Sequence, residues 1–175
     1  VPVDDEGEEL ISLVPDKAAA GYAAGYADAD YVASLPTFKL PHLPRNKTYR
    51  AFQISGDSML PLTSGTIIIG EYVESVSDIK NGQTYILATR EDGLVYKRVF
   101  DYIEERKKLF LVSDNEMYSP YEVDPGEVLE LWSARAYISQ DFPQSKPGSD
   151  KMDINSLQEM VMQLQKEVGD LKKAK

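Results

Sequence analysis

The side chains best suited to chemistry in this sequence are a serine and a lysine. Ser58 stands in the run Gly-Asp-Ser-Met-Leu-Pro (residues 56–61), and Lys97 follows it by 97 − 58 = 39 residues. A serine hydroxyl is a poor nucleophile unless a base removes its proton. His42, the single histidine, lies in a Pro-rich connector, so a neutral lysine is the alternative base. The pKa of a free lysine is about 10.4, and burial can lower it by several units.

Ser58 is expected on a sharp turn that leaves its hydroxyl exposed. The backbone N–H groups of Ser58 and Met59 could then stabilise an oxyanion. The alternative is a strand end that turns into a loop, in which Gly56, Asp57 and Pro61 have only the structural role of forming the turn.

Lys97 lies within the strand-like run of residues 94–100, and alternation places it on the same face as Val95 and Val99. An amine on that apolar face would be partly desolvated. Because the opposite face is also apolar, the pattern does not decide which face of the strand points inward. An edge-strand lysine that prevents aggregation fits the pattern equally well.

Short runs rich in Val, Ile, Tyr and Phe must position both residues. The expected strands are Tyr49–Ser55, Thr66–Val73, Thr84–Thr89, Leu94–Tyr102, Lys108–Ser113 and Glu127–Ile138. Turn signals separate them, and Asp92-Gly93 is the strongest hairpin signal. No helical pattern interleaves with these runs, so the fold is predicted to be mostly β with largely antiparallel strands.

Four segments are expected along the chain. Residues 1–48 form an extended N-terminal segment, residues 49–140 the β-rich domain, residues 141–150 a linker, and residues 151–175 a C-terminal amphipathic helix. The helix carries β-branched residues at heptad position a and leucine at d, which favours a parallel two-stranded coil. A tail helix that docks on its own domain is the alternative.

Composition excludes several functional classes. The chain of 175 residues has a formal net charge of -10, so direct binding to nucleic acid is not expected. It has no cysteine and one histidine, so neither a metal site nor any other cofactor is predicted. No apolar run approaches a membrane span and no signal peptide is visible, so we expect a cytoplasmic protein without a membrane partner.

The residues around the serine and the lysine resemble those of the LexA, lambda-repressor and UmuD family. The resemblance rests on Phe52–Pro61, Gly65, Ile67–Ile69, Asn81-Gly82, Tyr85, Val95–Val99, Leu111–Asn115, Tyr118 and Pro120. It implies a signal-peptidase-type β fold with a catalytic Ser58/Lys97 dyad. Type I signal peptidases share this chemistry, but they need a membrane anchor that this sequence lacks.

Members of the family cut their own chain at an Ala-Gly or Cys-Gly bond upstream of the serine. This sequence offers Ala20-Gly21, which we favour, and Ala24-Gly25 as the alternative site. The segment would thread into a narrow site as an extended strand, and Lys97 would take the proton of Ser58. A plain flexible linker is the competing interpretation of these alanines and glycines.

The resemblance predicts the C-terminal autoproteolysis and dimerisation domain of a transcriptional repressor. The implied partners are a second copy of the chain, a RecA filament as co-protease, and DNA bound only through a helix-turn-helix domain upstream of Val1. The alternatives are a UmuD-like polymerase accessory protein and a non-cleaving oligomerisation module with the same fold.

Overall fold

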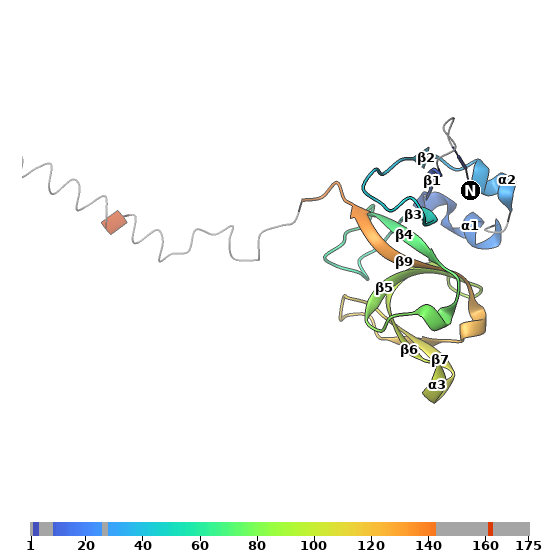
Figure 1. Ribbon diagram of the computed structural model, residues 1–175. Helices are drawn as coiled ribbons and strands as arrows, with labels where there is room; N and C mark the ends of the chain where they lie inside the picture. The colour runs from blue at the N-terminus through green and yellow to red at the C-terminus, as the bar shows by residue number, and fades with distance from the viewer. Residues whose placement is uncertain (1, 4–8, 26–27, 143–160, 163–175) are drawn as a thin grey trace, which may run out of the picture. The chain divides into compact units, whose positions relative to one another are not determined.

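The structure is a computed structural model that describes residues 2, 3, 9–25, 28–142, 161 and 162 (Figure 1). The chain divides into two compact units, Val1–Asp141 and Phe142–Lys175. In the second unit only Phe142, Val161 and Met162 are described, and the last two are helical. The rest of the heptad pattern lies outside the described residues, so the self-association of this segment stays a prediction.

The first unit is built on one sheet of nine strands, in the order β2-β1-β3-β4-β9-β5-β6-β7-β8. Its strands are β1 Ile11–Val14, β2 Thr37–Phe38, β3 Tyr49–Gln53, β4 Ile67–Val73, β5 Gln83–Thr89, β6 Gly93–Tyr102, β7 Lys108–Val112, β8 Tyr121–Val123 and β9 Val128–Ile138. Only the β1–β3 pair is parallel among the strand pairs described. The prediction of a mostly β, largely antiparallel fold is therefore confirmed.

All six strands expected from the sequence occur, with ends that differ by no more than two residues. The hairpin expected at Asp92-Gly93 joins β5 to β6, and Thr89 pairs with Gly93 at its closed end. The additional strands β1, β2 and β8 have two to four residues each, which is too short for a clear alternating pattern.

The N-terminal segment differs from the extended connector that we expected. It contains strand β1 and two short helices, α1 Ala19–Gly25 and α2 Ala29–Ala33. Alanine has the highest helix propensity, and α1 contains four alanines in the sequence AAGYAAG. At the start of α2, the Asp28 carboxylate accepts hydrogen bonds from the backbone N–H groups of Asp30 and Tyr31. Figure 1 shows both helices beside the β1–β3 end of the sheet. A third helix, α3 Ile103–Arg106, connects β6 to β7.

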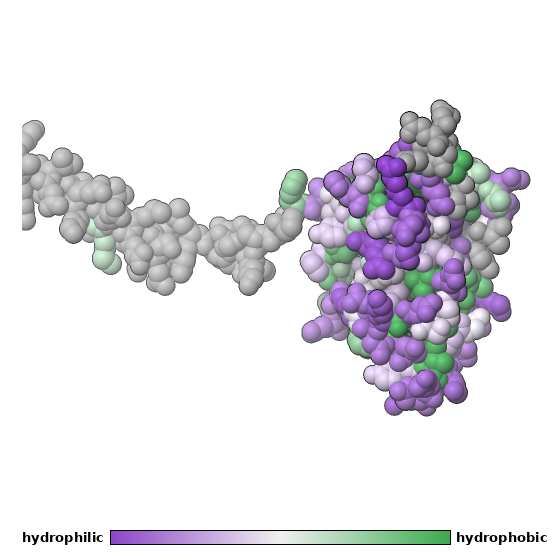
Figure 2. Space-filling view, viewed as in Figure 1, coloured by the Kyte–Doolittle hydropathy of each residue, from purple (hydrophilic) through white to green (hydrophobic). Residues whose placement is uncertain are grey.

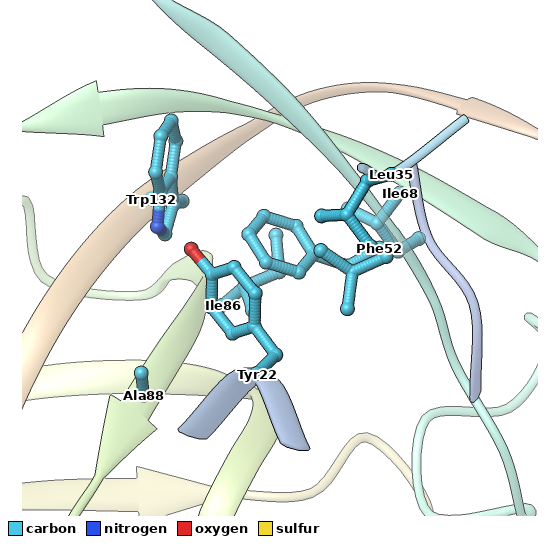
Figure 3. Packing of buried hydrophobic residues seen from close by; sticks show 8 residues of the cluster. Tyr22, Leu35, Phe52, Ile68, Ile86, Ala88 and Trp132 are labelled. Carbon is cyan, nitrogen blue, oxygen red and sulfur yellow. The ribbon is translucent and has the colours of Figure 1, made fainter. Parts of the chain in front are cut away.

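One core cluster joins α1 to the sheet. It centres on Tyr22, Phe52, Ile86 and Trp132, all buried (Figure 3). The ring of Phe52 lies between the other two aromatic rings, 5.7 Å from Tyr22 and 5.6 Å from Trp132. Helix α1 is therefore held by the same core that organises β3, β5 and β9.

A second cluster lies between β5, β6, β7 and β9, and it includes the fully buried Leu87, Val99 and Leu109. The face of the molecule in Figure 2 is largely hydrophilic, with small, separate apolar areas. On this face few apolar side chains reach the surface, in keeping with the expected alternation.

Strand β4 passes very close to β9 at Gly70. A β-bulge lies between Ile69 and Gly70, and a Cβ atom at Gly70 would lie 2.6 Å from the Cβ of Trp132. No side chain fits there without a shift of the backbone, so glycine is required for this crossing.

Candidate functional site

Ser58 lies on the loop between β3 and β4. Two hydrogen bonds close the base of this loop, from Ile54 N to Thr66 O at 2.9 Å and from Gly65 N to Ile54 O at 2.8 Å. Gly56 has φ +81°, a conformation that L-residues rarely adopt, and it turns the chain just before the serine. Met59 is buried and anchors the turn, while Ser58 itself is half-buried. The turn expected from the sequence therefore leaves the serine side chain partly accessible, while the next residue is buried in the core.

Lys97 lies in the middle of β6, where it pairs with Tyr85 of β5. Its Nζ atom donates a hydrogen bond of 2.7 Å to the Oγ atom of Ser58. Burial lowers the pKa of Lys97 from its ordinary value because desolvation disfavours the charged ammonium. The structure thus brings together the two residues that sequence analysis selected, in a geometry that permits proton transfer.

Both faces of β6 are covered by other side chains. This explains why the sequence alone did not show which face of the strand points inward. Val95 and Val99 belong to the second core cluster, whereas Leu94 and Tyr96 pack on the cluster around Trp132. Lys97 is half-buried between these groups and carries no acidic partner within salt-bridge distance among the described residues.

A cleft of about 240 Å³ opens beside the serine–lysine pair. Ile54 and Leu94 contribute apolar wall, and Asp16 and Ala19 line it from the N-terminal segment. The backbone N–H of Asp16 donates to the side chain of Gln53 at 3.2 Å, which ties this segment to the end of β3. The segment that contains the expected cleavage bond therefore begins at the wall of the cleft.

The expected cleavage residues themselves lie in a helix in this structure, and the extended form expected for docking beside Ser58 stays a prediction. Ala20, Gly21, Ala24 and Gly25 all belong to α1, and the first two are exposed. The side chain of Tyr31 in α2 lies beside both glycines, since Cβ atoms at Gly21 and Gly25 would lie 3.3 and 3.6 Å from it. The α-helical backbone does not expose the carbonyl of residue 20 as an extended strand would.

Tyr22, the second residue after the Ala20-Gly21 bond, is completely buried and fixes α1 in this position. Its hydroxyl donates to Glu130 and accepts from Arg50. Trp132 Nε1 donates to the same carboxylate at 3.0 Å, and the Arg50 guanidinium lies 4.7 Å from the Trp132 ring. Burial, and next the charge of Glu130, raise the pKa of Tyr22, so its hydroxyl stays protonated and able to donate.

The loop after β7 contacts the nucleophile turn, a role that sequence analysis did not assign. Asn115 N donates to Ser58 O at 3.0 Å, and Asn115 Nδ2 donates to Asp57 O at 3.0 Å. The Tyr118 hydroxyl donates to the Asp57 carboxylate, and its ring centroid is 6.0 Å from Lys97 Nζ. The resemblance included Asn115 and Tyr118, but only the fold brings them to the serine.

The described part of the chain holds no group of three or more histidine, aspartate or glutamate side chains arranged to bind a metal ion. Nor does any helix within it have the length and apolar character that crossing a lipid bilayer requires.

A largely antiparallel sheet that brings a serine on the β3–β4 loop to a lysine on β6 is the arrangement expected of a serine-peptidase-type fold. The family model described as Peptidase S24-like matches residues 12–133, so the chain belongs to this family, which includes LexA, UmuD and phage repressors. No curated protein matches the chain significantly.

Proposed function

We propose that this chain is the autoproteolysis and dimerisation domain of a transcriptional repressor, and that it cuts its own Ala20-Gly21 bond to inactivate repression. The observation that carries the proposal is the 2.7 Å separation between Lys97 Nζ and Ser58 Oγ. The lowered pKa of Lys97 adds to it, because only the neutral amine can accept a proton.

The reaction begins when neutral Lys97 takes the proton of the Ser58 hydroxyl. The oxygen attacks the Ala20 carbonyl carbon, and the resulting oxyanion is stabilised by the N–H groups of Ser58 and Met59. Collapse of the intermediate breaks the bond to Gly21, whose nitrogen receives the proton from Lys97. Water then releases the Ala20 carboxylate from the serine. Because the substrate belongs to the same chain, its effective concentration is high and weak docking suffices.

The helical segment must first change its conformation. Attack requires the Ala20 carbonyl to reach Ser58, so α1 must unwind and Tyr22 must leave its contacts with Glu130 and Arg50. The rate of cutting then depends on the small population of unwound chains. This supports slow or conditional cleavage, for which a RecA filament that favours the unwound form is the proposed trigger.

Incubation of the purified chain at alkaline pH, followed by intact-mass measurement and N-terminal sequencing, tests the proposal. We expect a new N-terminus at Gly21 from the wild type and none from Ser58→Ala. A new terminus at Gly25 would move the cut to the alternative Ala24-Gly25 bond. Equal cutting in Ser58→Ala, or no cutting with and without an activated RecA filament, would contradict the proposal.

The helical state of α1 favours one second candidate, a non-cleaving oligomerisation module with the same fold. Under that function the serine–lysine pair would remain inert, and the chain would still form dimers. Light scattering on Ser58→Ala, which cannot cut, separates association from cleavage. A UmuD-like role differs in its partner, and a helix-turn-helix domain encoded upstream would favour the repressor instead.

A further inference from the structure

The backbone around the nucleophile is held from one side by a single asparagine. Asn115 donates through its backbone N–H to the carbonyl of Ser58 and through Nδ2 to the carbonyl of Asp57, both at 3.0 Å. These are the carbonyl groups of two successive peptide units. The unit with the Asp57 carbonyl contains the N–H of Ser58, and the unit with the Ser58 carbonyl contains the N–H of Met59.

Because the peptide bond is planar, these two contacts also fix the directions of the N–H groups in the same peptide units. In a trans peptide the C=O and N–H groups point in opposite directions. Both units are trans, since the one cis bond among the described residues is Leu60–Pro61. With both carbonyls directed at Asn115, the N–H groups of Ser58 and Met59 point away from it.

Neither of these N–H groups donates to a protein acceptor within the described part of the chain. Ser58 lines the cleft beside Lys97, and Met59 lines it too. Two unpaired backbone donors next to a nucleophilic oxygen can stabilise a developing oxyanion. Such donors are effective only when they are oriented before the reaction.

Asn115 is itself held in place by its own loop and by the residue before it. Its Oδ1 accepts from Met117 N at 3.1 Å, which fixes the side chain within its own loop. The preceding residue, Asp114, accepts two hydrogen bonds of 2.8 Å from Arg98. Arg98 directly follows Lys97 on β6, so the strand that carries the amine also positions the loop that holds the serine.

We propose that Asn115 is a positioning residue for self-cleavage, which directs the N–H groups of Ser58 and Met59 toward the carbonyl under attack. This inference rests on the proposed peptidase function and adds a residue to it. Asn115 touches neither the substrate nor the reacting atoms in this assignment; it acts through the two peptide units.

The test uses the neutral variant Asn115→Leu, which removes both side-chain hydrogen bonds and keeps the backbone N–H. A second variant, Asn115→Asp, keeps the acceptor for Met117 N and loses only the donor to Asp57 O. The matched control is Asn46→Leu, because Asn46 is exposed and lies outside the site. The rate of self-cleavage is measured across pH, which gives a limiting rate at high pH and a midpoint.

Loss of one oxyanion donor reduces rates by about 100- to 1,000-fold, so we expect misalignment to reduce the limiting rate by about 10-fold or more. The midpoint of Asn115→Leu should stay that of the wild type, because the amine of Lys97 is not altered. A wild-type limiting rate, or a loss explained wholly by a shifted midpoint in Asn115→Leu, would overturn the proposal.

An independent measurement does not depend on cutting. In a Lys97→Ala background, residual dipolar couplings report the directions of the N–H bonds of Ser58 and Met59. We expect Asn115→Leu to change the coupling of Ser58, because its peptide unit loses the hydrogen bond from Nδ2, while Asn46→Leu changes neither coupling. An unchanged Ser58 coupling would overturn the orienting role. Absence of cutting in the wild type would instead overturn the peptidase function, and with it the part that Asn115 plays in cleavage.

Discussion

The hydroxyl of Tyr22 is bonded to Glu130, a residue 108 positions further along the chain. The same tyrosine is the second residue after the bond that we propose to be cut. The contact therefore links the stability of the helical N-terminal segment to the availability of that bond for cleavage.

Tyr22→Phe should accelerate self-cleavage. The ring would still fill the core, but the hydroxyl that bonds to Glu130 and Arg50 would be lost. A buried hydrogen bond to a charged group contributes about 1.5–3 kcal/mol, so release of α1 should become about 10-fold or more easier. First-order cleavage rates at one pH measure the effect.

The control for this change is Tyr137→Phe, since the side chain of Tyr137 is 58% exposed. It should cut at the wild-type rate. Slower cutting in Tyr22→Phe than in the wild type would mean that the tyrosine assists the reaction rather than restraining it.

Gly70→Ala should destabilise the domain. The added methyl group would collide with the β carbon of Trp132, whose position is fixed by the backbone of β9, so the side chain cannot rotate it out of the way. Overpacking of this kind costs about 1–3 kcal/mol, and urea unfolding in a Ser58→Ala background measures it. Gly126→Ala is the comparison, because its Cβ would meet the nearest atom at an ordinary 3.5 Å. Equal midpoints for both variants would contradict the close approach of β4 and β9.

The Arg98–Asp114 pair should affect cleavage more than stability. Both side chains are partly exposed, at 36% and 29%, and such pairs contribute roughly 0.2–1 kcal/mol to folding. Asp114→Asn would weaken the hold on the loop that carries Asn115, and we expect a several-fold lower cleavage rate. Arg106→Met is the control, because the pair formed by Arg106 and Glu122 is looser, at 3.9 Å. A lower unfolding midpoint with an unchanged cleavage rate would contradict this positioning effect.

The long strands could be predicted from sequence because their alternating Val, Ile and Tyr residues face a core on one side and turns bound them. The helical state of residues 19–25 was not predicted, since the two Ala-Gly pairs suggested a flexible or extended segment. What favours the helix is the burial of Tyr22 against Arg50 and Glu130, 28 and 108 residues away. Local patterns do not contain such contacts.

The site was predictable to a similar extent. The types and context of Ser58 and Lys97, together with the family resemblance, selected them before their distance was known. The part played by Asn115 required the fold, because a carbonyl hydrogen bond across 58 residues has no signature in the sequence.

The most direct measurement of the central claim is the pH dependence of self-cleavage. Burial places the pKa of Lys97 below its ordinary value, and the neutral fraction of the amine rises as pH increases toward that pKa. The rate should therefore rise about tenfold per pH unit, reach half of its limiting value at a midpoint below 10.5, and level off above that midpoint. Lys97→Ala should not cut at any pH. A rate independent of pH, or cutting that survives Lys97→Ala, would contradict the assignment of Lys97 as the base for Ser58.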